Sequence, residues 1–146
     1  MGPTGVGKTD LVIELYSQIP IKIISVDSIQ IYKNLNVGSG KPSNEVLKQY
    51  PHALIDFVEP TESYSTARFQ KDVIHCIKDS FETNKTPILV GGTMMYFHHL
   101  INGISNLPSV SNQIRIAVQS EFDEKGSEEM HKYLQKIDRK SSLRIH

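Results

Sequence analysis

The stretch Gly2-Pro3-Thr4-Gly5-Val6-Gly7-Lys8-Thr9 fits the phosphate-binding pattern G-x-x-x-x-G-K-[ST] at every fixed position. Its glycines permit a tight turn in which successive backbone N–H groups point into one concavity and cradle a polyphosphate. In such a loop the Lys8 ammonium reaches the terminal phosphates, and the Thr9 hydroxyl is placed to ligate Mg²⁺. Helical spacing follows, so the positive N-terminal end of a helix also faces the anion. The stretch therefore predicts a phosphate-binding loop.

Only Met1 precedes this loop, although loops of this kind normally lie at the C-terminal end of a strand. We therefore expect the chain to be a fragment, or to have a misplaced start, and to lack the first strand of its sheet.

Strand and helix patterns alternate after the loop. Apolar positions recur at helical spacing up to Pro20, which is expected to end the first helix. Short apolar runs then predict strands at 21–26, 53–57 and 87–90, and helical spacing predicts helices at 43–50, 65–81 and 94–101. The alternation predicts an α/β fold, a P-loop NTPase-like parallel sheet flanked by helices. The expected buried faces of the first and longest of these helices are Leu11, Val12, Leu15 and Ile19, and Phe69, Val73, Ile77 and Phe81.

The sequence changes character beyond Pro108. The stretches 111–125, 127–137 and 138–145 have helical patterns with alternating charge, and no strand pattern lies between them. We expect residues 1–110 to form the α/β core and residues 111–146 to begin an α-helical insertion.

The composition is that of a globular protein, with 38% hydrophobic and 22% charged residues. The formal net charge is zero, so no overall positive field indicates nucleic acid and any RNA contact has to be local. Cys76 is the only cysteine, which excludes an intrachain disulfide and a cysteine-based zinc site and fits the reducing cytoplasm. No apolar segment approaches the roughly 20 residues that span a bilayer.

Asp27 comes directly after the predicted strand 21–26, where parallel α/β sheets carry functional groups. Its carboxylate suits a Mg²⁺ ligand or a general base beside bound phosphates, and a plain turn cap is the less favoured alternative. Thr93 follows Gly91 and Gly92 at the end of another strand. Its hydroxyl either reaches a phosphate or nucleobase, or only caps the next helix, and the pattern favours neither.

The loop from Ile29 to Pro42 holds Gln30, Tyr32, Lys33 and Lys41. Glutamine can pair with adenine, tyrosine can stack on a base and the lysines can meet phosphates, although an ordinary solvated loop is favoured. The adjacent His98 and His99 diverge on a helix and cannot share a metal on one face, and His52 and His75 are expected to be structural.

With these features the chain resembles the tRNA dimethylallyltransferases, also called tRNA isopentenyltransferases. The blocks around Asp27 and around Gly91-Gly92-Thr93 are together specific, whereas the phosphate-binding loop alone is shared with many nucleotide-binding enzymes. The resemblance covers essentially the whole chain in the family's order. It rests on residues 2–9, 25–33, 38–42, 51–56, 64–69, 90–97 and 107–109.

The resemblance implies that the loop binds the diphosphate of dimethylallyl diphosphate, with Mg²⁺ at Thr9 and with Lys8 stabilising the leaving group. The implied acceptor is the exocyclic amine of the adenine beside the anticodon of tRNA, flipped into a channel. Asp27 matches the general base, and Thr93 lies near both substrates. The positions that match tRNA contacts are Asp27, Ser28, Ile29, Gln30, Thr93 and Arg115.

The resemblance also implies truncation at both ends, because family members continue well past His146, and it makes residues 111–146 the beginning of a tRNA-binding insertion. The implied partners are tRNA and dimethylallyl diphosphate, with no membrane and a monomeric state. Three alternatives remain: an isopentenyltransferase that acts on free adenine nucleotides, an ordinary P-loop phosphotransferase, and an inactive phosphate-binding fragment.

Overall fold

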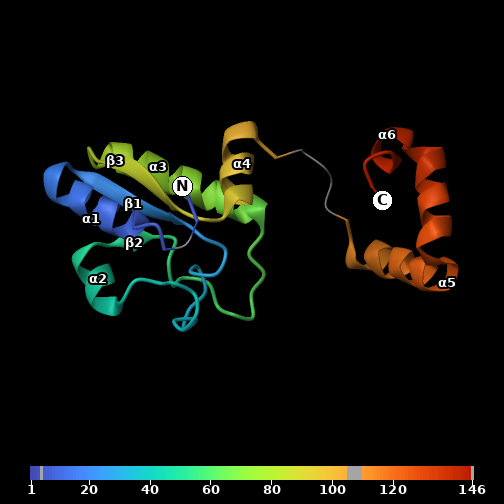
Figure 1. Cartoon of the computed structure of the whole chain (residues 1–146), viewed down its shortest axis with the longest axis horizontal. Helices are drawn as coiled ribbons and strands as arrows, with labels where there is room; N and C mark the ends of the chain where they lie inside the picture. The colour runs from blue at the N-terminus through green and yellow to red at the C-terminus, as the bar shows by residue number, and fades with distance from the viewer. Residues whose placement is uncertain (4, 105–109, 146) are drawn as a thin grey trace. The chain divides into compact units, whose positions relative to one another are not determined.

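The computed structural model describes residues 1–3, 5–104 and 110–145. The chain divides into two compact units, residues 1–105 and 106–146, which are treated separately below (Figure 1). Thr4, which belongs to the predicted phosphate-binding loop, lies outside the described residues.

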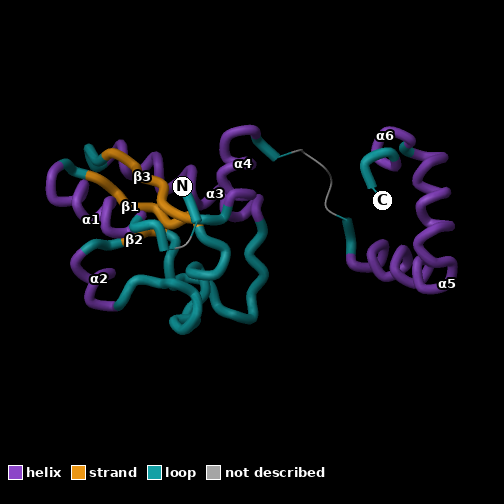
Figure 2. The backbone as a smooth tube through the Cα atoms, in the orientation of Figure 1, coloured by secondary structure: helices purple, strands orange, loops and turns teal. Residues whose placement is uncertain are grey.

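Three parallel strands form the centre of the first unit. They are β1 (Ile21–Val26), β2 (His52–Ala53) and β3 (Thr86–Gly91), in the order β2-β1-β3 (Figure 2). β1 pairs with β3 along its whole length and with β2 through two residues. The central position of β1 explains its near-continuous burial, because strands covered on both faces need apolar side chains throughout. The predicted parallel α/β fold is confirmed.

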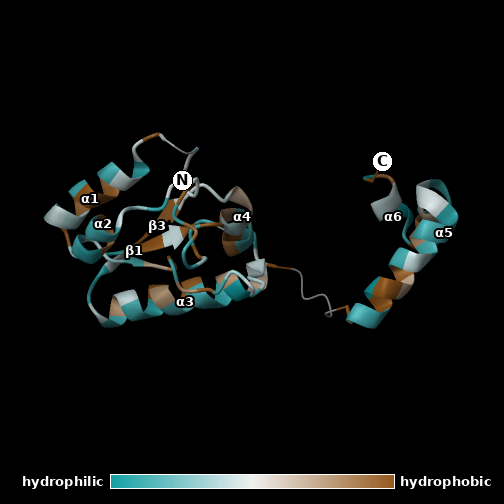
Figure 3. Ribbon diagram, turned by 90° about the horizontal axis from the view of Figure 1, so that it is seen from below, coloured by the Kyte–Doolittle hydropathy of each residue, from teal (hydrophilic) through white to brown (hydrophobic). Residues whose placement is uncertain are grey.

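Helices cover both faces of this sheet: α1 (Lys8–Gln18) on one, α3 (Thr66–Glu82) and α4 (Met94–Asn102) on the other. Successive side chains of a strand point to opposite faces. Accordingly Ile21 and Ile23 cluster with Val12 of α1, whereas Ile24 and Val26 cluster with the buried residues of α3 and α4. Figure 3 shows the apolar strands between α1 and α3. The short helix α2 (Asn44–Gln49) follows the loop after β1.

The prediction of a strand over 53–57 is wrong in its extent. β2 contains only His52 and Ala53, because Leu54 and Asp56 have left-handed backbones with φ of 61° and 57°. A strand requires negative φ, so the extended pairing stops there. Pairing with the segment that follows β1 resumes at Val58, which forms an isolated parallel bridge with Tyr32.

Parts of the predicted apolar faces are also exposed. Leu11 and Ile19 remain open to solvent while Val12 is buried, so α1 presents a narrower face to the sheet than its periodicity predicts. Phe81, near the end of α3, is likewise exposed, whereas Phe69 and Val73 are buried as predicted.

The described part of the second unit is helical, as its sequence predicts. Helix α5 (Asn112–Ile137) is interrupted at Gly126, whose φ of 76° separates two helical stretches, and α6 (Arg139–Ser142) follows. The break falls between the predicted helices 111–125 and 127–137. Within residues 1–3, 5–104 and 110–145, no helix is both long and apolar enough to cross a membrane.

Candidate functional site

The phosphate-binding loop ends at the first turn of α1. Gly5 and Gly7 have φ of 83° and 77°, a conformation that residues with a side chain rarely adopt. Gly7 is the N-cap of α1 and has no side chain to accept a hydrogen bond from the first turn. The N–H groups that a capping side chain normally satisfies therefore remain open to an anion, and the helix dipole adds to the attraction.

Lys8, the first residue of α1, extends back over the loop. Its ammonium donates to the carbonyl oxygen of Gly2 at 2.8 Å and also to that of Pro3. A lysine ammonium has three donors, so these two contacts leave one for another acceptor. The charge is thus held beside the glycine backbone that is predicted to bind phosphate.

Asp27 lies directly after β1 and shapes the turn that follows. Its Oδ1 accepts hydrogen bonds from the backbone N–H groups of Ile29 at 2.8 Å and Gln30 at 3.1 Å. This is the turn-capping contact that the sequence left as an alternative. Among the described residues no hydrogen bond reaches Oδ2 of this carboxylate. One oxygen therefore fixes the orientation of the group, and the other is available to a ligand.

Thr93 connects the end of β3 to the Asp27 turn. Its Oγ1 accepts from the backbone N–H of Ser28 at 3.0 Å, and its own N–H donates to the Val26 carbonyl at 3.3 Å. Although Thr93 is the N-cap residue of α4, its side chain makes no capping hydrogen bond. The hydroxyl of Thr93 thus holds Ser28, and its backbone N–H holds Val26, on the two sides of Asp27.

Gly91 allows this close approach of two strand ends. A Cβ at Gly91 would lie 2.0 Å from the Val26 carbonyl oxygen, far inside van der Waals contact. A glycine in a strand often marks such a close backbone approach. Gly91 and Thr93 together fix the position of Asp27.

A cavity of about 290 Å³ brings these groups together. It is lined by the loop residues Gly5, Gly7, Lys8 and Thr9 and by Asp27, Gln30, Gly91 and Gly92. Other predicted positions lie elsewhere: Gly2 and Pro3 line a separate cavity, Val6 and Ile29 are exposed, and Arg115 is an exposed residue of α5 in the second unit. Ser28 joins the site through its hydrogen bond to Thr93.

His52 is a cavity residue that the sequence analysis missed. It pairs in register with Ile23 on β1, and its Nδ1 lies 2.6 Å from the Tyr50 carbonyl oxygen. A carbonyl only accepts, so Nδ1 carries the proton and Nε2 is the acceptor of the neutral ring. Burial lowers the pKa of His52, and the contact with Tyr50 opposes this effect. An isolated histidine in the sequence gave no signal of this placement, which depends on strand pairing.

The side-chain amide of Gln30 is already engaged within the protein. Its Nε2 donates to the carbonyl oxygens of Ser39 at 3.3 Å and Gly40 at 3.0 Å, and its Oε1 lies 3.5 Å from the Ser25 hydroxyl. In this structure Gln30 therefore connects β1 to the loop that ends at Pro42.

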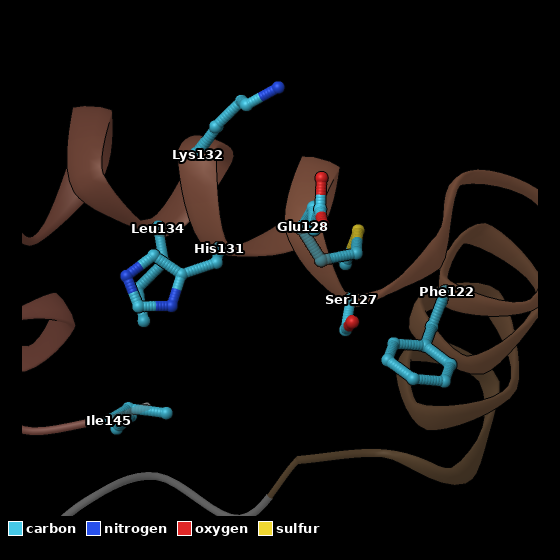
Figure 4. Close-up of a pocket in the computed structure, with 8 residues that line it drawn as sticks. Phe122, Ser127, Glu128, His131, Lys132, Leu134 and Ile145 are labelled. Atoms are coloured by element: carbon cyan, nitrogen blue, oxygen red, sulfur yellow. The ribbon is translucent and has the colours of Figure 1, made fainter.

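A larger cavity of about 590 Å³ lies within the second unit (Figure 4). Phe122, Met130, Leu134 and Ile145 give it a mainly apolar lining, with His131 among the polar residues. Of these two cavities, only the smaller one is lined by glycines, those of the phosphate-binding loop and of the end of β3 among them. We therefore assign phosphate chemistry to the smaller cavity.

The chain is similar to known proteins in sequence and in overall fold. The family model described as IPP transferase matches residues 30–146. The chain belongs to the IPP transferase family. The resemblance found in the sequence is thereby confirmed.

Solved structures of family members extend the match to the N-terminal loop. A full-length tRNA isopentenylpyrophosphate transferase from Bacillus halodurans is 34% identical over 99% of this chain and 48% of its own, with a TM-score of 0.68. A tRNA delta(2)-isopentenylpyrophosphate transferase from Staphylococcus epidermidis is 33% identical over 100% of this chain and 48% of its own, with a TM-score of 0.65.

A eukaryotic dimethylallyltransferase captured acting on tRNA is 27% identical over 99% of this chain and 36% of its own, with a TM-score of 0.80. The chain thus spans about half the length of the bacterial IPP transferases and about a third of the eukaryotic one.

Proposed function

We propose that this protein transfers a dimethylallyl group from dimethylallyl diphosphate to the exocyclic amine of the adenine beside the anticodon in tRNA. The observation that carries the proposal is the cavity where an anion-binding loop meets an oriented carboxylate, Asp27, in a chain of the IPP transferase family. A group transfer that releases diphosphate needs both: donors for the departing anion and an acceptor for the proton of the nucleophile.

The donor diphosphate binds in the phosphate-binding loop, residues 2–9. The uncapped N–H groups at the start of α1 and the Lys8 ammonium supply hydrogen bonds and positive charge. As the C–O bond to the prenyl group breaks, negative charge grows on the diphosphate, so these donors stabilise the transition state more than the ground state.

Mg²⁺ fits this site as an ion that is held mainly by the substrate. Thr9 lines the cavity and offers one hydroxyl ligand, and no cluster of three or more His, Cys, Asp or Glu side chains exists among the described residues. Mg²⁺ commonly keeps several waters and binds through substrate phosphates with few protein ligands, which matches this donor set. When bound, the ion neutralises charge on the leaving diphosphate.

The acceptor amine approaches Asp27. Oδ1 of Asp27 is occupied by the turn N–H groups of Ile29 and Gln30, so Oδ2 receives the proton as the amine nitrogen bonds to the prenyl carbon. The amine of adenine is a weak nucleophile, so positioning and leaving-group stabilisation supply most of the acceleration. Thr93 acts as a catalytic residue near both substrates, through its hold on Ser28.

The tRNA contacts of the proposal come from both units. Asp27 and Gln30 line the cavity, and Ser28 and Thr93 are hydrogen-bonded to each other next to Asp27. The exposed Ile29, together with Arg115 of α5, completes the proposed contacts. In this proposal residues 111–146 begin a tRNA-binding insertion, and the protein acts as a cytoplasmic monomer.

Isothermal titration with Mg²⁺ tests the donor site, using dimethylallyl diphosphate and, separately, ATP. We expect tighter binding of the prenyl diphosphate and a loss of about tenfold or more in affinity in Lys8→Ala, because a charged donor to phosphate is removed. Lys48→Ala, on the exposed face of α2, is the matched control and leaves the affinity unchanged. Tighter binding of ATP would instead support an ordinary phosphotransferase, and equal affinity in Lys8→Ala would remove the loop from the donor site.

A further inference from the structure

Lys41 is a lysine that the structure withdraws from solvent. It belongs to the 33–42 loop, which runs from Lys33 to Pro42, and its side chain is only 3% exposed. The ammonium donates to the Tyr32 carbonyl at 2.8 Å, to Asn36 Oδ1 at 3.2 Å and to Asp56 Oδ1 at 2.8 Å. All three donors of an ammonium are thereby used. Lys41 is therefore a structural cation of this loop and has no donor left for a phosphate.

Asp56 ties this ammonium to the neighbouring chain segment. Its Oδ1 also accepts from the backbone N–H of Asn34 at 3.2 Å, and its own N–H donates to the Gln30 carbonyl at 3.0 Å. The hydrogen bond from Lys41 is the main reason that the pKa of Asp56 is lowered. Asp56 holds a left-handed backbone that is unfavourable for a residue with a Cβ, so its contacts have to compensate for that conformation.

The residues just before Lys41 line the cavity. Ser39 and Gly40 accept the two hydrogen bonds of the Gln30 amide, and both line the cavity together with Pro42 and Asp27. A chain of contacts therefore runs from Asp56 through Lys41 to the wall of the cavity and to Gln30, three residues after Asp27. The wall made by Ser39, Gly40 and Pro42 is called the acceptor-side wall below.

We propose that Lys41 and Asp56 are positioning residues that hold the acceptor-side wall in place for the adenine. The inference rests on the proposed function, in which Asp27 and Gln30 face the acceptor. Lys41 touches no reacting atom, and its effect passes through the backbone of Ser39 and Gly40 to the Gln30 amide. Loss of its charge therefore weakens acceptor binding and leaves the diphosphate, held by the loop 2–9, largely unaffected.

The test compares Lys41→Met with Lys33→Met in the same loop. Lys33 pairs with Glu59 on the surface, with a side chain 40% exposed, so it is a matched control of equal size and charge. We expect amide hydrogen exchange over residues 34–42 to accelerate by about tenfold or more in Lys41→Met and by less than about twofold in Lys33→Met. Lys41→Arg keeps the charge and is expected to restore part of the protection.

Two dissociation constants separate positioning from a general loss of structure. Binding of a synthetic anticodon stem-loop RNA is expected to weaken by about tenfold in Lys41→Met, with dimethylallyl diphosphate affinity within about twofold of the unchanged protein. Asp56→Asn, which keeps the lysine, is expected to show the same pattern. Equal exchange in both lysine variants would overturn the proposal, as would a parallel loss of diphosphate affinity. If the unchanged protein binds no diphosphate, the proposed function fails, and the exchange comparison still decides the role of Lys41.

Discussion

The two units of the chain stabilise their helices by different means. In the first unit, α3 and α4 bury Phe69, Val73 and Tyr96 against β1, so residues far apart in the sequence share one core. In the second unit no residue of α5 is buried, and large apolar side chains such as Ile116 and Ile137 are exposed.

Local contacts take the place of a core in the second unit. Ion pairs join Glu121 to Lys125 and Glu129 to Lys132 within α5, and Ser111 caps its first turn. Exposed pairs of this kind contribute little because solvent screens them, whereas burial of one large apolar side chain contributes about 1.5–3 kcal/mol. The comparison indicates that folding cooperativity resides in the first unit.

Replacement of one phenylalanine by alanine in each unit gives the largest expected difference in the free energy of unfolding. Phe69 is 1% exposed and stacks on Tyr96 with ring centroids 4.2 Å apart, whereas Phe122 of α5 is 44% exposed. We expect Phe69→Ala to lower the free energy of unfolding by about 4 kcal/mol and Phe122→Ala by about 1 kcal/mol or less. Urea titration measures both. Equal losses would show that the second unit has a core of its own.

Substitution of single glycines by alanine is expected to lower the stability less than Phe69→Ala does, through local changes in the backbone. In Gly91→Ala the new Cβ meets the Val26 carbonyl at 2.0 Å, and we expect a loss of about 3 kcal/mol because backbone has to move. Gly38→Ala is the control: its φ is 76° but nothing lies within 4 Å, so only backbone strain of about 1 kcal/mol is expected. Thermal melting of the two variants separates the clash from the strain. An equal loss of stability in both variants would mean that the ends of β1 and β3 can separate without a further loss of stability.

The smallest expected effect is a pH dependence of the folding stability, which arises from His52 in the first unit. Burial lowers the pKa of His52 below its ordinary value of 6.5, so the unfolded chain binds the proton more readily than the folded one. The contribution of neutral His52 to the free energy of unfolding is therefore complete above pH 6.5. It declines as the pH falls from 6.5 toward the pKa of His52 in the folded protein. The slope is at most about 1.4 kcal/mol per pH unit for one proton.

Urea titrations between about pH 7.5 and about pH 5.5, which span one unit on either side of 6.5, measure this slope. It is expected to decrease in His52→Gln, which keeps a polar side chain without a titrating ring. An unchanged slope in that variant would assign the pH dependence to other groups.

The sequence was sufficient for elements whose own pattern determines them. The strand at 21–26, the helix at 65–81 and the break between the stretches 111–125 and 127–137 were each predicted and lie within one residue of the observed β1, α3 and Gly126. β2 was predicted too long because its end depends on a distant residue. Asp56 takes up a left-handed backbone while paired with Lys41, and no local pattern records that contact.

The candidate site likewise contains some residues that the sequence predicted and some that it did not. The phosphate-binding loop and Asp27 were predicted from motif and strand end, and Gly5, Gly7, Lys8 and Thr9 of the loop line one cavity with Asp27. His52 and the Lys41–Asp56 pair were not predicted, because strand register and loop folding place them there. The catalytic and binding roles of all these residues remain predictions, for which the titrations and variants above are the tests.

The contact of Lys8 with the carbonyl oxygens of Gly2 and Pro3 has a consequence for selectivity. An anion that enters the loop either uses the one remaining donor of the ammonium or replaces these two neutral acceptors, so the loop carries its own weak competitor. A singly charged anion gains little in the exchange, whereas a diphosphate replaces both acceptors with stronger, charged ones. The loop is thus set to discriminate by charge density, and chloride or bicarbonate at cellular concentration displaces the internal acceptors far less readily than a diphosphate does.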